Sequence, residues 1–352
     1  MWRNLETSTN SKRTTTPRLC WGSKMLERWR SLSPVPEIGA RNVLIADSAH
    51  PLDFRIGRDC RGRFVFMLDT DKPVDKRPVL PSVKGMLIEL ENLANDRTRL
   101  VVVLQDDADL QNFSLMCTGL MLATNAISAS RSPEGLLKTL EELHRWHEML
   151  KRRRDNRLTR SERIGLVGEL LFLRDELLPR MEILPALLAW TGHEGHEQDF
   201  VISSAIFEVK TQVVTADRMI SISSEDQLDP VQGRILLCNQ GISPVPSGTS
   251  NACTLNSIVK ELVGLAKATG GAASDLLAIG LLEAGYEPHE EYDDEIWMLV
   301  DRAVYEIRGD FPRIERAELR HGVEQVRYRI RVSDCQPYGV DLHSTLEKLI
   351  YG

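Results

Sequence analysis

The segment from Ser161 to about Leu178 constrains the fold more than any other part of this chain. Between residues 164 and 173, apolar side chains fall on almost every face of a helix instead of on one stripe. We therefore expect a helix here that is buried on nearly all sides. Glu169 interrupts the apolar run, and a charged carboxylate in such surroundings is costly unless a cation or a metal ion pairs with it.

Two short apolar segments further along the chain predict a β-hairpin. Residues 199–202 and 205–211 have the composition of strands, and a two-residue Ser-Ser turn separates them. The two-residue period of the second strand places Glu208 and Lys210 side by side on one face. Pairing of the two strands would bring Asp199, at the start of the first, alongside them.

Two carboxylates that converge in this way suit a hard divalent cation. Mg²⁺ prefers oxygen ligands and is commonly held by one or two carboxylates together with water molecules. A neighbouring lysine can orient or help deprotonate an attacking water, while the cation neutralises charge on a scissile phosphate. The tripeptide Glu208-Val209-Lys210 is a weak signal alone, but its order after Glu169 and Asp199 is informative.

The order of these motifs resembles the PD-(D/E)XK superfamily, in particular a bacterial family encoded near restriction and phage-defence genes. The residues that carry the resemblance lie between about 160 and 230 and are Gly168-Glu169-Leu170, Asp199-Phe200, Glu208-Val209-Lys210-Thr211 and Gln227-Leu228. The resemblance implies a mixed α/β, restriction-endonuclease-like core, with a central mixed sheet flanked by helices. Gln198 stands where many members have proline, a departure that the superfamily tolerates.

Roles for five residues follow from the resemblance. Asp199, Glu208 and Glu169 would be ligands of Mg²⁺, with Mn²⁺ as the alternative ion, and Glu169 would reach it directly or through water. Lys210 would be the catalytic lysine, and Gln227 would position water or phosphate.

The expected activity is that of a metal-dependent endonuclease that hydrolyses DNA in a restriction or phage-defence system. Further subunits of such a system, or a homodimer, would be its protein partners. Because a fold does not guarantee catalysis, a catalytically inactive DNA- or partner-binding module is the alternative, and a purely structural subunit is a third.

A plainer interpretation competes for each site residue taken singly. Glu208 and Lys210 would then form an ion pair on an exposed strand, and Glu169 would pair with Arg163 or Arg174.

Two charged runs outside the motif have both a functional and a structural interpretation. The four cations at 151–154 either contact a phosphate backbone or form a solvated helix face. The acidic run at 290–295 is expected to be a solvated loop, away from any DNA groove.

Two further groups resemble metal sites. The acidic residues Asp106, Asp107 and Asp109 form either a metal-binding loop or, as we favour, a turn after a buried strand. His193 and His196 lie in a glycine-containing loop with no second cluster of ligands, so zinc is not favoured.

The pattern divides the chain into a polar, basic and disordered tail at 1–24, a β-rich N-terminal domain at 25–130, and a nuclease-like domain with a C-terminal extension at 131–352. In the first domain, strands are expected near 54–56, 63–68, 85–90 and 100–104. In the second, a helix begins at Ser132, strands are expected near 219–223, 233–237, 297–305 and 325–332, helices near 255–268, 274–282 and 342–351, and a loop at 241–250.

Composition narrows the class of protein only a little. The 352 residues, 42% hydrophobic and with a net charge of −7, are ordinary for a globular protein, and the longest apolar runs are too short to cross a membrane. The six cysteines are scattered, which favours a reducing compartment, the cytoplasm. The negative charge does not exclude DNA binding, because such enzymes often confine their positive charge to one groove.

Overall fold

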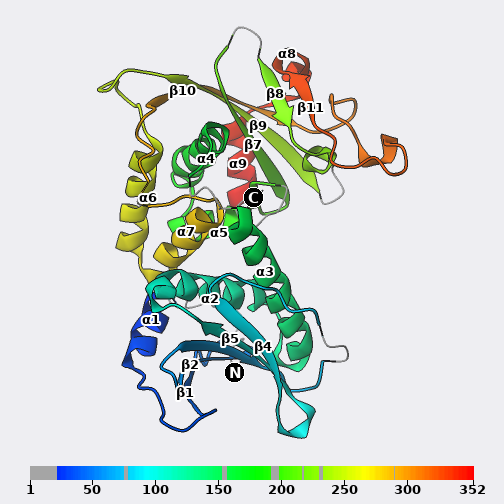
Figure 1. Ribbon diagram of the computed structural model, residues 1–352. Coiled ribbons are helices and arrows are strands. Elements are labelled where there is room, and N and C mark those ends of the chain that lie inside the picture. The colour runs from blue at the N-terminus through cyan, green and yellow to red at the C-terminus, as the bar shows by residue number, and fades with distance from the viewer. Residues whose placement is uncertain are drawn as a thin grey trace, which may run out of the picture.

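The computed structural model of the protein describes residues 22–352, except 75–77, 153–156, 192–197, 216–217, 230–232 and 289. Three sequence predictions fall wholly or mainly outside the described residues: the tail, whose first 21 residues are outside, the side chains of the cation run at 151–154, and the pair His193 and His196. The described chain forms two halves, each built on a five-stranded sheet (Figure 1).

The first half is an antiparallel sheet with helices on one face. In spatial order its strands are β1 (Arg41–Ile45), β2 (Asp53–Asp59), β3 (Phe64–Asp69), β5 (Thr98–Leu104) and β4 (Met86–Asn92). The covering helices are α1 (Gly22–Ser31), α2 (Leu110–Thr124) and α3 (Ser132–Arg152) (Figure 1). Alternate residues of β3, beginning with Phe64 and Phe66, point into the core between sheet and helices, as the two-residue period requires.

Helix α2 corrects the sequence prediction, which had strands throughout the region from 40 to 130. Residues 110–124 place buried side chains around most of the helix, so they show little of the one-sided pattern that identifies a surface helix. The acidic cluster before it is a turn: Asp106 Oδ1 accepts a hydrogen bond from Ala108 N at 3.0 Å. The turn that we favoured for this cluster is therefore confirmed.

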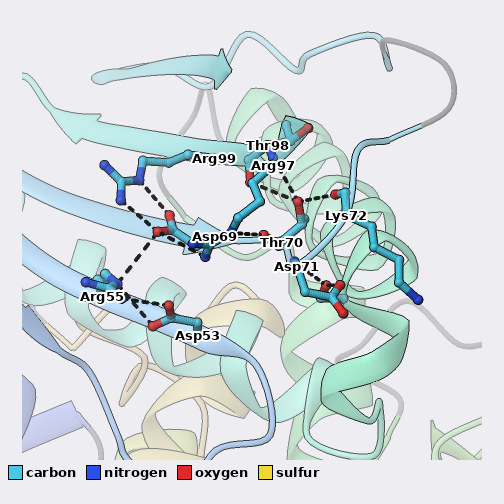
Figure 2. Close-up of polar contacts among 10 residues, drawn as sticks. Asp53, Arg55, Asp69, Thr70, Asp71, Lys72, Arg97, Thr98 and Arg99 are labelled. Atoms are coloured by element: carbon cyan, nitrogen blue, oxygen red, sulfur yellow. Dashed lines mark hydrogen bonds and ion pairs between the residues drawn. The ribbon is translucent and has the colours of Figure 1, made fainter. Parts of the chain in front are cut away.

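The opposite face of the first sheet carries a network of ion pairs around Asp69, whose side chain is only 3% exposed (Figure 2). Arg99 Nη2 donates to Asp69 Oδ2 at 2.7 Å, while Arg55 Nε and Arg97 Nη2 lie 3.7 and 3.9 Å from the same oxygen. Arg55 also pairs with Asp53 at 2.7 Å. Each carboxylate here faces at least one guanidinium, so the network is a structural element of the sheet.

The second half is built on a mixed sheet, as the sequence predicted. In spatial order its strands are β12 (Gly339–Val340), β10 (Trp297–Glu306), β9 (Arg234–Pro244), β7 (Ala205–Val213) and β6 (Phe200–Ile202). Strands β7 and β9 run parallel, and the other neighbours run antiparallel.

The two faces of this mixed sheet have different covers (Figure 1). One face packs against five helices, which are α4 (Arg160–Phe172), α5 (Ile183–Ala189), α6 (Leu255–Thr269), α7 (Gly271–Glu283) and α9 (Leu342–Tyr351). The other face packs against a two-stranded sheet, β8 (Met219–Ile222) with β11 (Tyr328–Arg331), and the short α8 (Val332–Cys335). The site residues on β7 lie between these two layers.

Several boundaries differ from the sequence prediction, and three of them have a clear physical reason. Strand β9 continues to Pro244, into the expected loop at 241–250, because Ile242 is fully buried and pairs with Leu299 of β10. Strand β11 covers only part of the expected strand at 325–332, because the chain turns into α8 at Val332. Helix α4 begins one residue earlier than expected and is capped by Thr159, whose hydroxyl accepts a hydrogen bond from the N–H of Glu162.

The two halves pack against each other where they meet. Trp146 of α3 packs in the core of the first sheet, and Leu282 of α7, from the second half, is buried in that same core. Arg145 Nη2 lies 3.3 Å from Glu283 Oε1. We therefore propose that the boundary between the halves lies between α3 and α4, and not near residue 131.

No single helix in the described part of the chain is long and apolar enough to cross a membrane. One bent pair, Asp107–Thr124 with Ala129–Glu148, passes that test by length and composition, with an angle of 105° between its members.

Candidate active site

The predicted hairpin is confirmed, and its register brings the site residues together. Phe200 pairs with Phe207 and Ile202 with Ala205, and Ser203 takes a left-handed conformation at the turn, with φ of 55°. Continuing this register by one residue places Asp199 opposite Glu208.

A hydrogen bond ties Asp199 to the second strand of the hairpin. Asp199 Oδ2 accepts a hydrogen bond from Val209 N at 2.7 Å. The side chain of Asp199 is thereby turned toward β7, next to Glu208.

Glu208 and Lys210 form an ion pair inside the protein, and not on an exposed strand as the plainer interpretation had it. Lys210 Nζ lies 2.7 Å from Glu208 Oε1, and the Glu208 side chain is 1% exposed. The second carboxylate oxygen, Oε2, is buried and has no hydrogen-bond partner among the described residues. A buried carboxylate oxygen without a partner is costly, so this atom marks a position where a cation would be stabilised.

Helix α4 contributes the third carboxylate. Glu169 Oε2 accepts a hydrogen bond from Trp190 Nε1 at 2.8 Å. In the described part of the chain, neither Arg163 nor Arg174 pairs with it, because Arg163 pairs with the acidic run at 290–295 and Arg174 with Asp175.

The acidic run is a loop, as predicted, with Glu291, Asp293 and Asp294 exposed, and it also pairs with the start of α4. Arg160 Nε lies 2.8 Å from Glu295 Oε1, and Arg163 pairs with both Asp294 and Glu295. The run is therefore partly neutralised by the first turn of this helix.

Burial raises the pKa of all three carboxyl groups, and the charge of Asp199 adds to this effect at Glu169 and Glu208. Burial, and then the charge of Asp199, raises the pKa of Glu169 to about 8, against the opposing effects of Trp190 and Lys210. Burial also raises the pKa of Asp199 to about 6, although Lys210 and the Val209 N–H act in the other direction. The pKa of Glu208 is raised well above its usual value by burial and by Asp199. A bound cation would relieve this repulsion.

Lys210 remains charged beside these groups. Burial by itself would lower the pKa of Lys210, but the carboxylates of Glu208 and Asp199 outweigh it and raise the pKa above its usual value. The side chain is thus an ammonium group that can donate hydrogen bonds to an anion or a water molecule.

Close packing of α4 on β7 holds Glu169 near the hairpin, and it depends on Gly168. A Cβ atom added at Gly168 would lie 1.6 Å from Thr211 Oγ1. Gln240 of β9 bridges the two elements, because its Nε2 donates to Gly168 O at 2.9 Å and to Thr211 Oγ1 at 3.2 Å.

Arg302 of β10 orients that glutamine. Arg302 Nε donates to Gln240 Oε1 at 2.6 Å, and its Nη1 pairs with Glu176. The sequence analysis missed these supporting residues, together with Trp190. The available signal was the pair Asn239 and Gln240, two polar residues in the otherwise apolar run that begins at Ile235.

The fifth predicted residue, Gln227, is engaged locally. It lies in the short helical turn Glu225–Leu228, and its Oε1 accepts a hydrogen bond from Ser223 N at 2.9 Å. Among the described residues, no hydrogen bond joins Gln227 to the other four predicted site residues, so its role stays a prediction.

The described residues contain no group of three or more His, Cys, Asp or Glu side chains arranged to hold a metal ion. Mg²⁺ does not need such a group, because one or two carboxylates with water molecules and substrate phosphate complete its octahedron. Asp199 and Glu208 match that smaller requirement.

A mixed sheet with helices packed on one face, with an acidic residue opening one strand and acid-x-Lys on the next, defines a protein of the PD-(D/E)XK-like α/β class. The model of the family described as "Putative PD-(D/E)XK family member (DUF4420)" matches residues 2–333, and the chain belongs to this family. No curated protein and no solved structure matches the chain.

Proposed function

We propose that the protein is a divalent-metal-dependent nuclease that hydrolyses phosphodiester bonds of DNA. The observation that carries the proposal is the convergence of Asp199, Glu208 and Lys210 on one hairpin, with a 2.7 Å ion pair between the last two. Membership of the PD-(D/E)XK family supports a nuclease-like chemistry.

The residues present fit a hard divalent cation. Glu208 Oε2 is a buried oxygen without a partner among the described residues, and burial, followed by the charge of Asp199, raises the pKa of Glu208. Asp199 and Glu208 would hold Mg²⁺ or Mn²⁺, and Glu169 would reach the ion directly or through water. When bound, the cation would supply electrostatic stabilisation of the negative charge that develops on the phosphate.

The chain's own residues would prepare the reaction. Lys210, fixed by Glu208, would orient the attacking water or donate to a phosphate oxygen. Trp190 would hold the carboxylate of Glu169 in place through its indole N–H. Gln227, if its side chain leaves Ser223, would position water or phosphate.

The proposal includes more specific expectations about the cleavage mode, the biological role, the partners and the compartment. They are endonucleolytic cleavage, a role in restriction or phage defence, further subunits or a homodimer as partners, and action in the cytoplasm. The five described cysteines are all unpaired, which supports a reducing compartment.

The proposal is tested by incubating the purified protein with plasmid and linear DNA in Mg²⁺, Mn²⁺ or EDTA, alongside Lys210→Ala. We expect cutting that needs the metal and is lost in the variant. DNA binding that persists in EDTA, with no cutting under any of these conditions, would instead establish the inactive binding module.

A further inference from the structure

A second polar region lies next to the candidate site, between the loop before residue 315 and strand β11. It is a pocket of about 460 Å³, and the residues that matter here are Arg313, Ile314, Tyr328, Arg329, Arg331 and Asp334. Three arginines face one acidic residue in this lining, so the pocket has a positive balance in a chain of net charge −7.

Arg313 is a buried cation that is only partly paired. Its side chain is 8% exposed, and its Nε donates to Glu315 Oε1 at 3.0 Å while Nη2 pairs with the same carboxylate. Its Nη1 is buried and has no hydrogen-bond partner among the described residues. Glu315 therefore fixes the guanidinium plane and leaves one donor for an anionic ligand.

Tyr328 adds a hydroxyl and connects this pocket to the candidate site. Burial raises the pKa of Tyr328, and the Ile314 N–H and the charges of Arg313 and Lys210 act in the other direction. The hydroxyl is therefore protonated at neutral pH, and it donates to no acceptor among the described residues. Tyr328 packs against the same hydrophobic cluster as Ile206 of β7, so the pocket wall adjoins the strand that carries Glu208 and Lys210.

The surrounding segment is the basic part of the second half. Residues 308–331 contain seven arginines and four acidic residues. Arg329 and Arg331 are exposed on β11, which lies over the sheet face that carries Glu208 and Lys210 (Figure 1). A nucleic-acid strand with one phosphate at the hairpin would therefore continue over a surface able to bind its neighbouring phosphates.

We propose that this pocket binds a backbone phosphate of the DNA substrate, close to the phosphate that is cut. Arg313 and Tyr328 donate to the phosphate oxygens, and Arg329 and Arg331 hold the strand at the rim. The inference rests on the proposed function for the identity of its ligand. The proposal assigns substrate binding to the pocket residues and hydrolysis to the hairpin residues.

The test measures binding of a short fluorescein-labelled DNA duplex by fluorescence anisotropy, in EDTA and over a range of salt concentrations. Arg329→Gln and Arg313→Gln should each weaken binding by about tenfold and reduce the salt dependence by about one phosphate contact. Arg61→Gln, an exposed arginine on the first half, is the matched control and should bind like wild type. Arg329 is exposed, so its variant keeps the test valid even if Arg313→Gln fails to fold.

Unchanged affinity and salt dependence in both pocket variants would overturn the inference, whether or not the wild type cuts DNA. Weaker binding in these variants would support it even if the wild type never cuts, in which case only the proposed hydrolysis fails. Inorganic phosphate, added at constant ionic strength, should compete with the duplex in wild type but not in Arg329→Gln. Equal competition in both proteins would contradict a phosphate site in this pocket.

Discussion

At the scale of single residues, burial of the carboxyl groups in the candidate site makes the stability of the protein depend on pH. The pKa values of Asp199, about 6, and Glu169, about 8, lie above the usual 3.8 and 4.5. A raised carboxyl pKa means that the folded state binds protons more tightly than the unfolded state. The associated stability is full below about pH 4 and is lost as the pH rises through 6 and then 8.

We therefore predict that the free energy of unfolding of the metal-free protein decreases by several kcal/mol between about pH 4 and about pH 8. Asp199→Asn should flatten the first part of this decrease, because its amide does not ionise. Urea unfolding in EDTA at a series of pH values measures both effects. A wild type of constant stability over this range, or one that becomes more stable as the pH rises, would contradict the charge state described for the site.

The residues that could be predicted from sequence are those whose neighbours are local. Asp199, Glu208 and Lys210 lie on a hairpin with a two-residue turn. The alternation of side chains along the second strand and the pairing of the two strands were therefore sufficient to place them together. Trp190 and Gln240 reach the site through tertiary packing, and no short-range pattern reports such contacts. Gln227 was chosen by resemblance alone, and its observed hydrogen bond to Ser223 is local.

At the scale of elements, the approach of α4 to β7 decides where Glu169 sits. Gly168→Ala should push the helix away from Thr211, because the new Cβ atom would lie far inside van der Waals contact. We expect a loss of about 3 kcal/mol in unfolding free energy, typical of overpacking in a buried interface.

Gly165→Ala, in the same helix, is the matched control. A Cβ atom there meets nothing within 4 Å, so the change should stabilise the protein by about 0.5–1 kcal/mol through helix propensity. Denaturant unfolding of the two variants separates packing from propensity. Equal stabilities for Gly168→Ala and wild type would show that the interface is looser than described.

Most elements with a recognisable apolar pattern were predicted well, including the helix α4, which is buried on several sides, whereas the helix α2 was missed. Strands β2 and β4 alternate, strands β3 and β5 are nearly continuous buried apolar runs, and helix α6 has an apolar stripe; all were found within a few residues. Helix α2 has apolar side chains around most of its circumference, and its pattern does not distinguish a helix from a buried strand. Strand β9 was cut short because Gly241 and Pro244 suggest a loop, whereas pairing with β10 keeps them extended.

At the scale of the whole molecule, the two halves should unfold together. Leu282 of α7 is buried in the core of the first half, and Arg145 pairs with Glu283 across the contact. We predict one calorimetric transition for wild type and two for Leu282→Asp, because a buried charge at this point would separate the cores. Two transitions in wild type would show that the halves are energetically independent.

The central claim is that the buried carboxylate of Glu208 serves DNA hydrolysis and not only the fold. The most direct measurement is the rate of Mg²⁺-dependent plasmid cleavage by Glu208→Gln, which keeps the shape of the side chain and removes its charge. Glu142→Gln, which changes a comparably buried carboxylate in the first half, is the control for folding. The account predicts a loss of at least about 100-fold for Glu208→Gln and a near wild-type rate for Glu142→Gln. Cleavage by Glu208→Gln at the wild-type rate would contradict it.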